Sequence, residues 1–92
     1  DRFVRNVLIA IGNSGQPALA AEAVRLLDDP SPLVRAMAVW AVGRLLPSEE
    51  VATLASERRG REPDEDVRRE WDYAREPSPR RGRGWPADAS RE

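Results

Sequence analysis

The chain has 92 residues, with 15 basic residues against 16 acidic ones and no cysteine, histidine or lysine. Without those side chains, disulfides, thiolate or imidazole metal sites, Cys or His catalysis and Schiff-base chemistry are excluded. The formal net charge of −1 argues neither for nor against a nucleic-acid partner.

The length allows one small domain. No stretch approaches the roughly 18 apolar residues of a membrane span, and the start lacks the basic-then-apolar pattern of a signal peptide. Because an apolar segment begins within two residues of Asp1, we expect the chain to be a fragment of a larger protein or a processed product.

The first predicted helix covers residues 2–13 and is apolar nearly all round. Its expected core stripe consists of Phe3, Val7, Ala10 and Ile11. The segment 12–15, Gly-Asn-Ser-Gly, predicts the end of this helix, because Gly and Asn tolerate the left-handed backbone conformation.

A second helix is predicted from Pro17, which suits the first turn of a helix, to the break at Asp28, Asp29 and Pro30. The third helix is predicted to begin at Ser31 and Pro32, where a serine caps free amides and a proline has no amide to leave unpaired. Its residues are apolar on two adjacent faces, which is typical of a helix with neighbours on both sides.

A fourth helix is predicted over residues 47–59 and a fifth from Asp64 onwards. The fifth helix has a single apolar stripe of Val67, Trp71 and Ala74 and a charged back, as a capping helix would. Residues 76–92 carry several Pro, Gly and Arg and no hydrophobic period, so we expect a disordered tail after a domain of residues 1–75.

The predicted helices belong to a repeat. Residues 3–12 align with residues 34–43, about 31 positions later, and residues 29–41 have a fainter copy in residues 62–74, about 33 positions later. A period in the low thirties fits two short helices and their turns. The sequence therefore predicts an all-α fold, an α-solenoid of about five helices.

The segment Asp29-Pro30-Ser31-Pro32-Leu33-Val34-Arg35, leading into a helix that ends near Gly43, resembles short HEAT-like repeats. A closer resemblance covers residues 1 to about 75. Residues 2–15, 28–35 and 38–45 together are similar to the C-terminal HEAT-like domain of the epoxyqueuosine reductase family.

That resemblance implies a cytoplasmic oxidoreductase of tRNA modification, which uses cobalamin and two [4Fe–4S] clusters to reduce epoxyqueuosine to queuosine. The present chain has no cysteine to hold those clusters. The resemblance therefore implies an N-terminal catalytic module elsewhere in the parent enzyme, and an accessory role for this chain in seating the tRNA anticodon arm.

The candidate nucleic-acid-binding residues are Arg2, Arg5, Asn6 and Arg35. Arg2, Arg5 and Asn6 interrupt an apolar helix that has no acid nearby except Asp1. An arginine presents a planar fork of donors that matches phosphate oxygens. The alternative for Arg35 is a structural ion pair with Asp29 or Asp28, and the same alternative for Arg68 is a pair with Asp64.

Three other features have simpler interpretations. Trp40 and Trp71 are expected in the core rather than stacked on bases. The acids around Asp64 match no calcium loop and are expected to cap a helix. The short Arg/Gly/Trp segment at 80–85 resembles RNA-binding segments, but a single copy is also compatible with a solvated extension.

Two alternatives to tRNA binding stay open. One is a protein-binding HEAT-like scaffold, of the kind found beside bilin lyases, in which the exposed flank of the first helix anchors a partner. The other is a purely structural lid that supports a catalytic module.

Overall fold

The computed structural model describes residues 2–75, and the predicted tail at 76–92, with its Arg/Gly/Trp segment, lies outside the described residues. Within 2–75 the chain forms helices and no strand, which confirms the all-α prediction. The five α-helices are α1 (Arg2–Ser14), α2 (Ala20–Arg25), α3 (Pro32–Leu45), α4 (Ser48–Arg58) and α5 (Glu65–Arg75). Three short 3₁₀ helices accompany them: η1 (Pro17–Leu19), η2 (Leu26–Asp28) and η3 (Arg59–Arg61).

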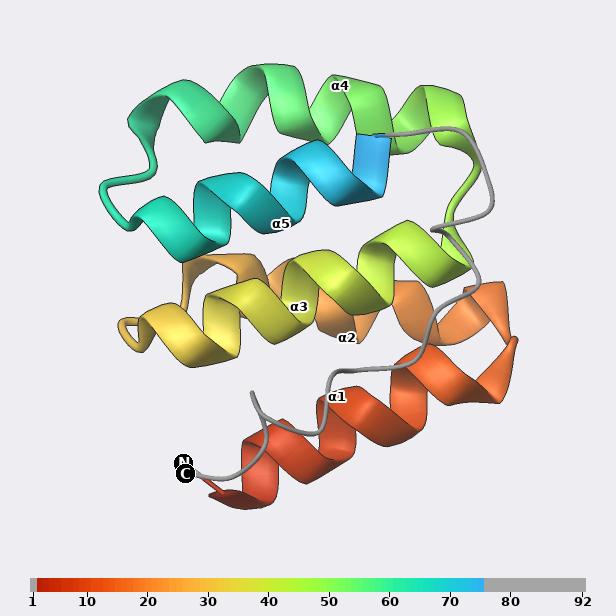
Figure 1. The fold of residues 1–92 in the computed structure, drawn as a ribbon. Coiled ribbons are helices and arrows are strands. Elements are labelled where there is room, and N and C mark those ends of the chain that lie inside the picture. The colour runs from red at the N-terminus through yellow and green to blue at the C-terminus, as the bar shows by residue number, and fades with distance from the viewer. Residues whose placement is uncertain (1, 76–92) are drawn as a thin grey trace.

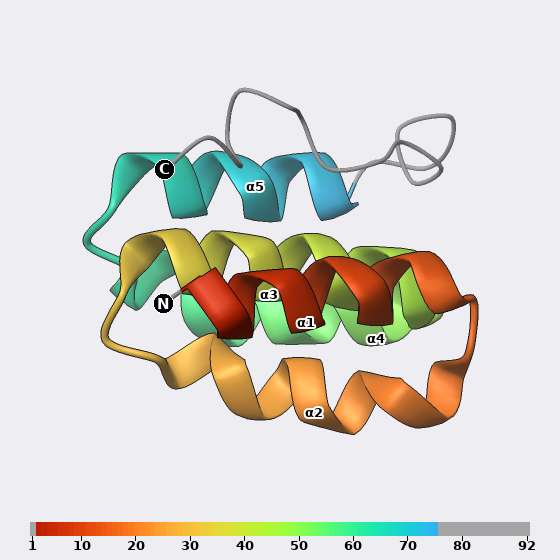
Figure 2. The same cartoon turned by 90° about the horizontal axis from the view of Figure 1, so that it is seen from below.

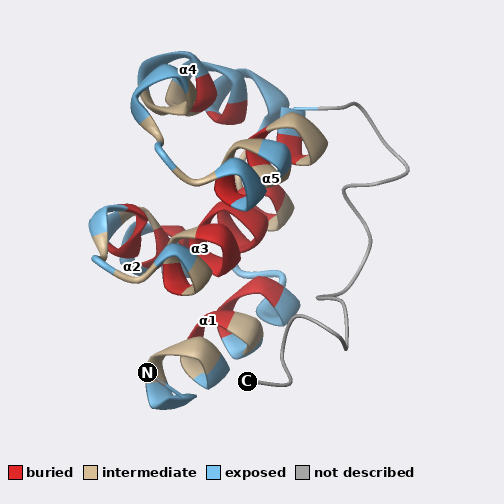
Figure 3. Ribbon diagram, turned by 60° about the vertical axis from the view of Figure 1, so that its left-hand side comes forward, coloured by how far each residue is buried: buried red, intermediate tan, exposed pale blue. Residues whose placement is uncertain are grey.

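The helices form two layers. Helices α1, α3 and α5 lie side by side in the first layer, while α2 and α4 lie in the second (Figures 1 and 3). Helix α3 is central, because it packs against α1, α2 and α5. Figure 2 shows α2 on one side of the α1 and α3 pair and α5 on the other. This stacking is the arrangement expected of a short α-solenoid.

The predicted capping residues begin the helices. The Ser31 hydroxyl accepts a hydrogen bond from the Val34 N–H at 3.3 Å at the start of α3. The Asp64 carboxylate accepts from the N–H groups of Asp66, at 2.9 Å, and Val67, at 3.1 Å, at the start of α5. At the end of α1, Gly15 has φ of 69°, so its left-handed backbone turns the chain away as predicted.

The second predicted helix is not continuous. Residues 17–28 form the six-residue α2 between η1 and η2 rather than one helix. The Asp29 N–H donates to the Leu26 carbonyl at 3.2 Å, so the chain tightens into a 3₁₀ turn before it leaves for α3. Leu26 and Leu27 are consecutive in this turn and both are buried.

Helix α3 is the centre of the core. Ten of its fourteen residues are buried, on every side of the helix (Figure 3). Trp40 is 3% exposed and Trp71 on α5 is 1% exposed, which confirms the prediction that both are core residues. The two apolar faces predicted for α3 therefore correspond to real neighbours on both sides.

The core stripe predicted for α1 is right for Ile11, which is buried, and Val7, which packs against the core. It is wrong for Phe3, which is 74% exposed, and for Ala10, which is exposed, whereas Leu8 and Gly12 are buried instead. Close contact at Gly12 explains the difference, because a Cβ there would lie less than 3.0 Å from two ring carbons of Trp40. Helix α1 turns this glycine towards α3, and Leu8, one turn earlier on the same face, enters the core with it.

Candidate functional site

The N-terminal half of α1 carries three of the predicted site residues. Arg2 and Asn6 are exposed and Arg5 is half-buried. Within residues 2–75, the side chains of these three residues make no hydrogen bond or ion pair. The Nε of Arg5 is shielded from solvent and has no partner there. Helix α1 contains no acid, so the edge formed by Arg2, Arg5 and Asn6, here called the α1 edge, carries two arginines that have no ion pair among residues 2–75.

The other arginines up to Arg69 differ from Arg2 and Arg5, since each has a partner within the described range. Five of them pair with carboxylates: Arg25 with Glu22, Arg35 with Glu62, Arg58 with Asp28, Arg59 with Asp72, and Arg69 with Glu65 and Asp66. The other three donate to backbone carbonyls: Arg44 to Gly12, Arg61 to Glu57, and Arg68 to Glu62. The fold therefore uses those arginines structurally and leaves the α1 edge available.

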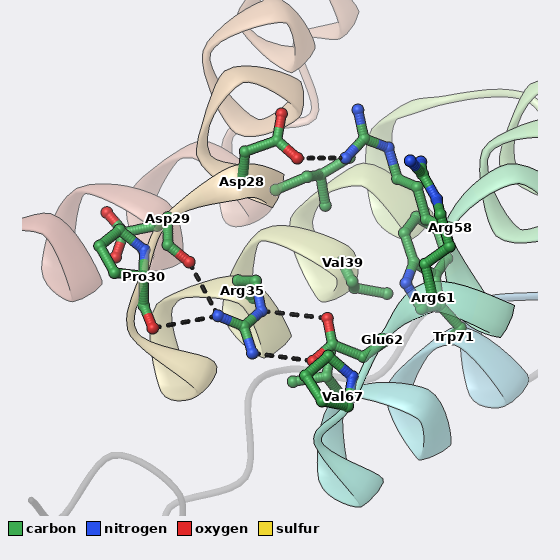
Figure 4. Close-up of a pocket in the computed structure, with 12 residues that line it drawn as sticks. Asp28, Asp29, Pro30, Arg35, Val39, Arg58, Arg61, Glu62, Val67 and Trp71 are labelled. Carbon is green, nitrogen blue, oxygen red and sulfur yellow. Dashed lines mark hydrogen bonds and ion pairs between the residues drawn. The ribbon is translucent and has the colours of Figure 1, made fainter.

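Arg35, the fourth predicted site residue, lies elsewhere and is fully engaged. Its Nε and Nη2 donate to the two carboxylate oxygens of Glu62 at 3.0 and 2.8 Å, and its Nη1 donates to the carbonyls of Asp29 and Pro30 (Figure 4). The side chains of Arg35 and Glu62 are only 15% and 9% exposed. The hydrogen bonds to Glu62 raise the pKa of Arg35 above its usual value. Arg35 thus joins two repeats and does not belong to the α1 edge.

The acidic partner predicted for Arg35 is wrong. The Asp29 carboxylate accepts the Ser31 N–H at 2.9 Å instead, and Asp28 pairs with Arg58 at 2.7 Å. The partner, Glu62, lies 27 residues further along the chain. Asp29 contributes its carbonyl oxygen rather than its carboxylate.

The same turn is built twice. Arg68 donates to the carbonyl of Glu62 at 2.6 Å rather than to Asp64, just as Arg35 donates to the carbonyl of Asp29. The carboxylate of each acid also accepts the N–H of the residue two positions later. Asp29 accepts from Ser31, and Glu62 accepts from Asp64. The sequence repeat already aligns the two acid-proline steps, Asp29-Pro30 and Glu62-Pro63, and what sequence reasoning missed is that each acid accepts a backbone N–H within its own turn.

A pocket of about 300 Å³ lies between these two turns. Figure 4 shows Asp28 and Asp29 on one side of it and Arg58 and Arg61 on the other. Its floor is apolar and comes from the side chains of Leu27, Val39, Val67 and Trp71. The ion pairs Arg58–Asp28 and Arg35–Glu62 both connect residues of the first turn region to residues near the second.

The ion pair between Asp72 on α5 and Arg59 on η3 predicts how the stability of the fold depends on pH. Hydrogen bonds from Arg59, at 2.8 and 2.9 Å, lower the pKa of Asp72 below its ordinary value of 3.8. The pair therefore stabilises the fold above about pH 4, and this contribution is lost as the pH falls through the lowered pKa. Because both side chains are about 40% exposed and solvent screens the pair, we expect this contribution to be small. Urea unfolding at pH 7 and pH 3 should show a smaller acid destabilisation in Asp72→Asn and in Arg59→Gln; unchanged pH dependence in both variants would contradict it.

Among residues 2–75, no group of three or more Asp, Glu, His or Cys side chains is placed to hold a metal ion. The acids of the α5 start, Glu62 and Asp64, accept backbone N–H groups instead. Within the same range, no helix combines the length and apolar character needed to span a membrane.

A family model described as HEAT repeats matches residues 2–72, from the start of α1 into the last turn of α5. The chain belongs to the HEAT repeat family. Among curated proteins and solved structures, none matches the chain. HEAT repeats form helical scaffolds whose extended surfaces bind partners, and each repeat contacts only its neighbours. The acid-proline turns with their bound arginines are the feature that this HEAT domain repeats, and α1 is the outermost helix of its layer within residues 2–75 (Figure 1).

Proposed function

We propose that this HEAT domain is a non-catalytic, tRNA-binding accessory domain of an epoxyqueuosine reductase, whose parent enzyme reduces epoxyqueuosine to queuosine in tRNA. The resemblance over residues 2–15, 28–35 and 38–45 supports the family. In this role the domain seats the anticodon arm and contributes affinity and orientation. Bond-making groups, cobalamin and the iron–sulfur clusters belong to the N-terminal catalytic module of the cytoplasmic parent.

The observation that carries the proposal is that the side chains of Arg2 and Arg5 have no hydrogen-bond or ion-pair partner among residues 2–75. Both lie on a helix without acids, and neither has a partner within the described part of the chain. A phosphate oxygen would supply the acceptor that the Arg5 guanidinium lacks, and charge-assisted hydrogen bonds of this kind are strong. The exposed Asn6 amide, one turn after Arg2, adds a donor and an acceptor on the same edge.

Salt dependence of tRNA binding tests the proposal. If the domain contacts Z phosphates, the logarithm of the binding constant should fall with the logarithm of salt concentration with a slope of about −0.7Z to −0.9Z. Arg5→Ala should reduce the magnitude of that slope by about one. The matched control is Arg69→Ala on α5, whose partners Glu65 and Asp66 already neutralise it. A flat salt response, or equal slopes for Arg5→Ala and the unchanged chain, would contradict the proposal.

Exposure of Phe3 favours a second candidate, a protein-binding scaffold. At 74% exposed, Phe3 is the most exposed large apolar side chain among residues 2–75 and lies on the same helix as the arginines. Burial of an aromatic anchor would make binding depend on Phe3 and little on salt. Phe3→Ala in the tRNA titration separates the two functions, because phosphate contacts do not require this ring.

A further inference from the structure

The pocket between the two acid-proline turns is lined by three acids and three arginines, and the acids do not pair with the three arginines equally. Of its three acids, Glu62 binds Arg35 directly, and the field of Asp29 acts on the same guanidinium. The third acid, Asp28, binds Arg58 through one contact and is 74% exposed. No carboxylate in this described part of the chain pairs with Arg61, whose Nε donates to the Glu57 carbonyl.

Arg58 and Arg61 therefore retain unused donors on one wall. Arg58 uses Nη1 for Asp28, while its Nε is shielded from solvent and has no partner among residues 2–75. The two Nη groups of Arg61 also have no acceptor in that range. A shielded N–H without an acceptor is energetically unfavourable, and a bound ligand oxygen that accepted from this N–H would offset the cost.

Both guanidinium groups come from the same short stretch of chain. Arg58 ends α4 and Arg61 ends η3, so the 3₁₀ turn brings their side chains to the same wall of the pocket (Figure 4). On this wall Arg58 has one exposed carboxylate partner, Asp28, and Arg61 has none among residues 2–75, so a further anion is attracted there. The planar fork of each arginine matches the oxygens of a carboxylate or phosphate. The volume of about 300 Å³ is at the lower end for pockets that bind small ligands.

We propose that this pocket binds one small oxyanion, a carboxylate or a phosphate group, through Arg58 and Arg61. The site is separate from the α1 edge and does not depend on tRNA binding there. Arg35 takes no part, because Glu62 and two carbonyls already occupy its donors.

NMR titration of the full chain tests the site. The Nε–Hε signals of Arg58 and Arg61 are followed as inorganic phosphate, or in a separate series acetate, replaces chloride at constant ionic strength. We expect the two signals to shift and saturate together. Arg61→Gln should weaken binding about tenfold or more, the expected effect of losing hydrogen bonds to a charged group. The matched control, Arg69→Gln, removes an exposed arginine outside the pocket and should leave the affinity unchanged.

The two series also identify the ligand class. Saturation with both anions supports a general oxyanion site, and saturation with one of them assigns the site to phosphates or to carboxylates. Shifts that grow without saturation, or that persist equally in Arg61→Gln, would overturn the site. Arg61→Lys retains the charge and provides a second variant, and circular dichroism shows whether each variant is folded. Loss of this site leaves the salt prediction for Arg5 intact.

Discussion

Glu62→Ala is expected to destabilise the fold by about 3 kcal/mol, because it leaves the Arg35 guanidinium without its carboxylate in a mostly buried position. The same change removes the acceptor of the Asp64 N–H at the start of α5. Urea unfolding followed by circular dichroism at pH 7 measures the loss. Glu62→Gln should cost less, since an amide oxygen can still accept one hydrogen bond.

The matched control is Glu65→Ala, a few residues away on α5. Glu65 is 76% exposed and lies 3.6 Å from Arg69, so its removal should cost less than about 1 kcal/mol. A double-mutant cycle of Glu62→Ala with Arg35→Met isolates the interaction energy of this ion pair. The double variant should lose less stability than the sum of the two single variants. Equal losses for Glu62→Ala and Glu65→Ala would show that Arg35 and Glu62 do not hold the two repeats together.

Gly12→Ala is expected to destabilise the fold by about 1–3 kcal/mol, the usual cost of overpacking a close contact. The new Cβ would overlap the ring of Trp40, which is buried and has little room to move. This loss is expected despite the helix propensity of alanine, which exceeds that of glycine by about 1 kcal/mol. Thermal and urea unfolding of the single variant measure the effect.

Two comparisons distinguish overlap from a general effect of alanine. Gly60→Ala places a Cβ with no atom within 4 Å, so stability should be unchanged or slightly higher. In a Trp40→Leu background, the cost of Gly12→Ala should fall, because the ring that it overlaps is gone. If Gly12→Ala is neutral in the original chain, the close approach of α1 and α3 is not a constraint.

Much of the fold could be predicted, because the decisive signals are local. Ser31 and Pro32 start α3, and Gly15 ends α1, each through the conformation of one or two residues. On α1 the prediction is right for Ile11 and wrong for Phe3, because close contact with Trp40 places Gly12 on the inner side of the helix. Apolarity alone does not reveal which side of an almost wholly apolar helix faces the core.

The candidate site was less predictable, because ion pairs depend on how the layers stack. Arg35 has two acids close in sequence, but turn geometry gives the Asp29 carboxylate to a backbone N–H, and Arg35 reaches Glu62 in the next repeat. Arg2, Arg5 and Asn6 could be singled out by the absence of acids in α1. Their role in binding tRNA remains a prediction for the salt titration.

The burial of α3 has a consequence for how this domain can acquire new specificity. Ten of its residues are enclosed, so nearly every substitution in the middle of this helix would disturb packing before it could alter recognition. Positions that can change without disturbing this packing are left on the exposed edge of α1, on the outward side of α4 and in turns other than the two acid-proline turns. Divergence between relatives that recognise different partners should therefore concentrate in those segments, while the sequence of the central helix stays nearly fixed.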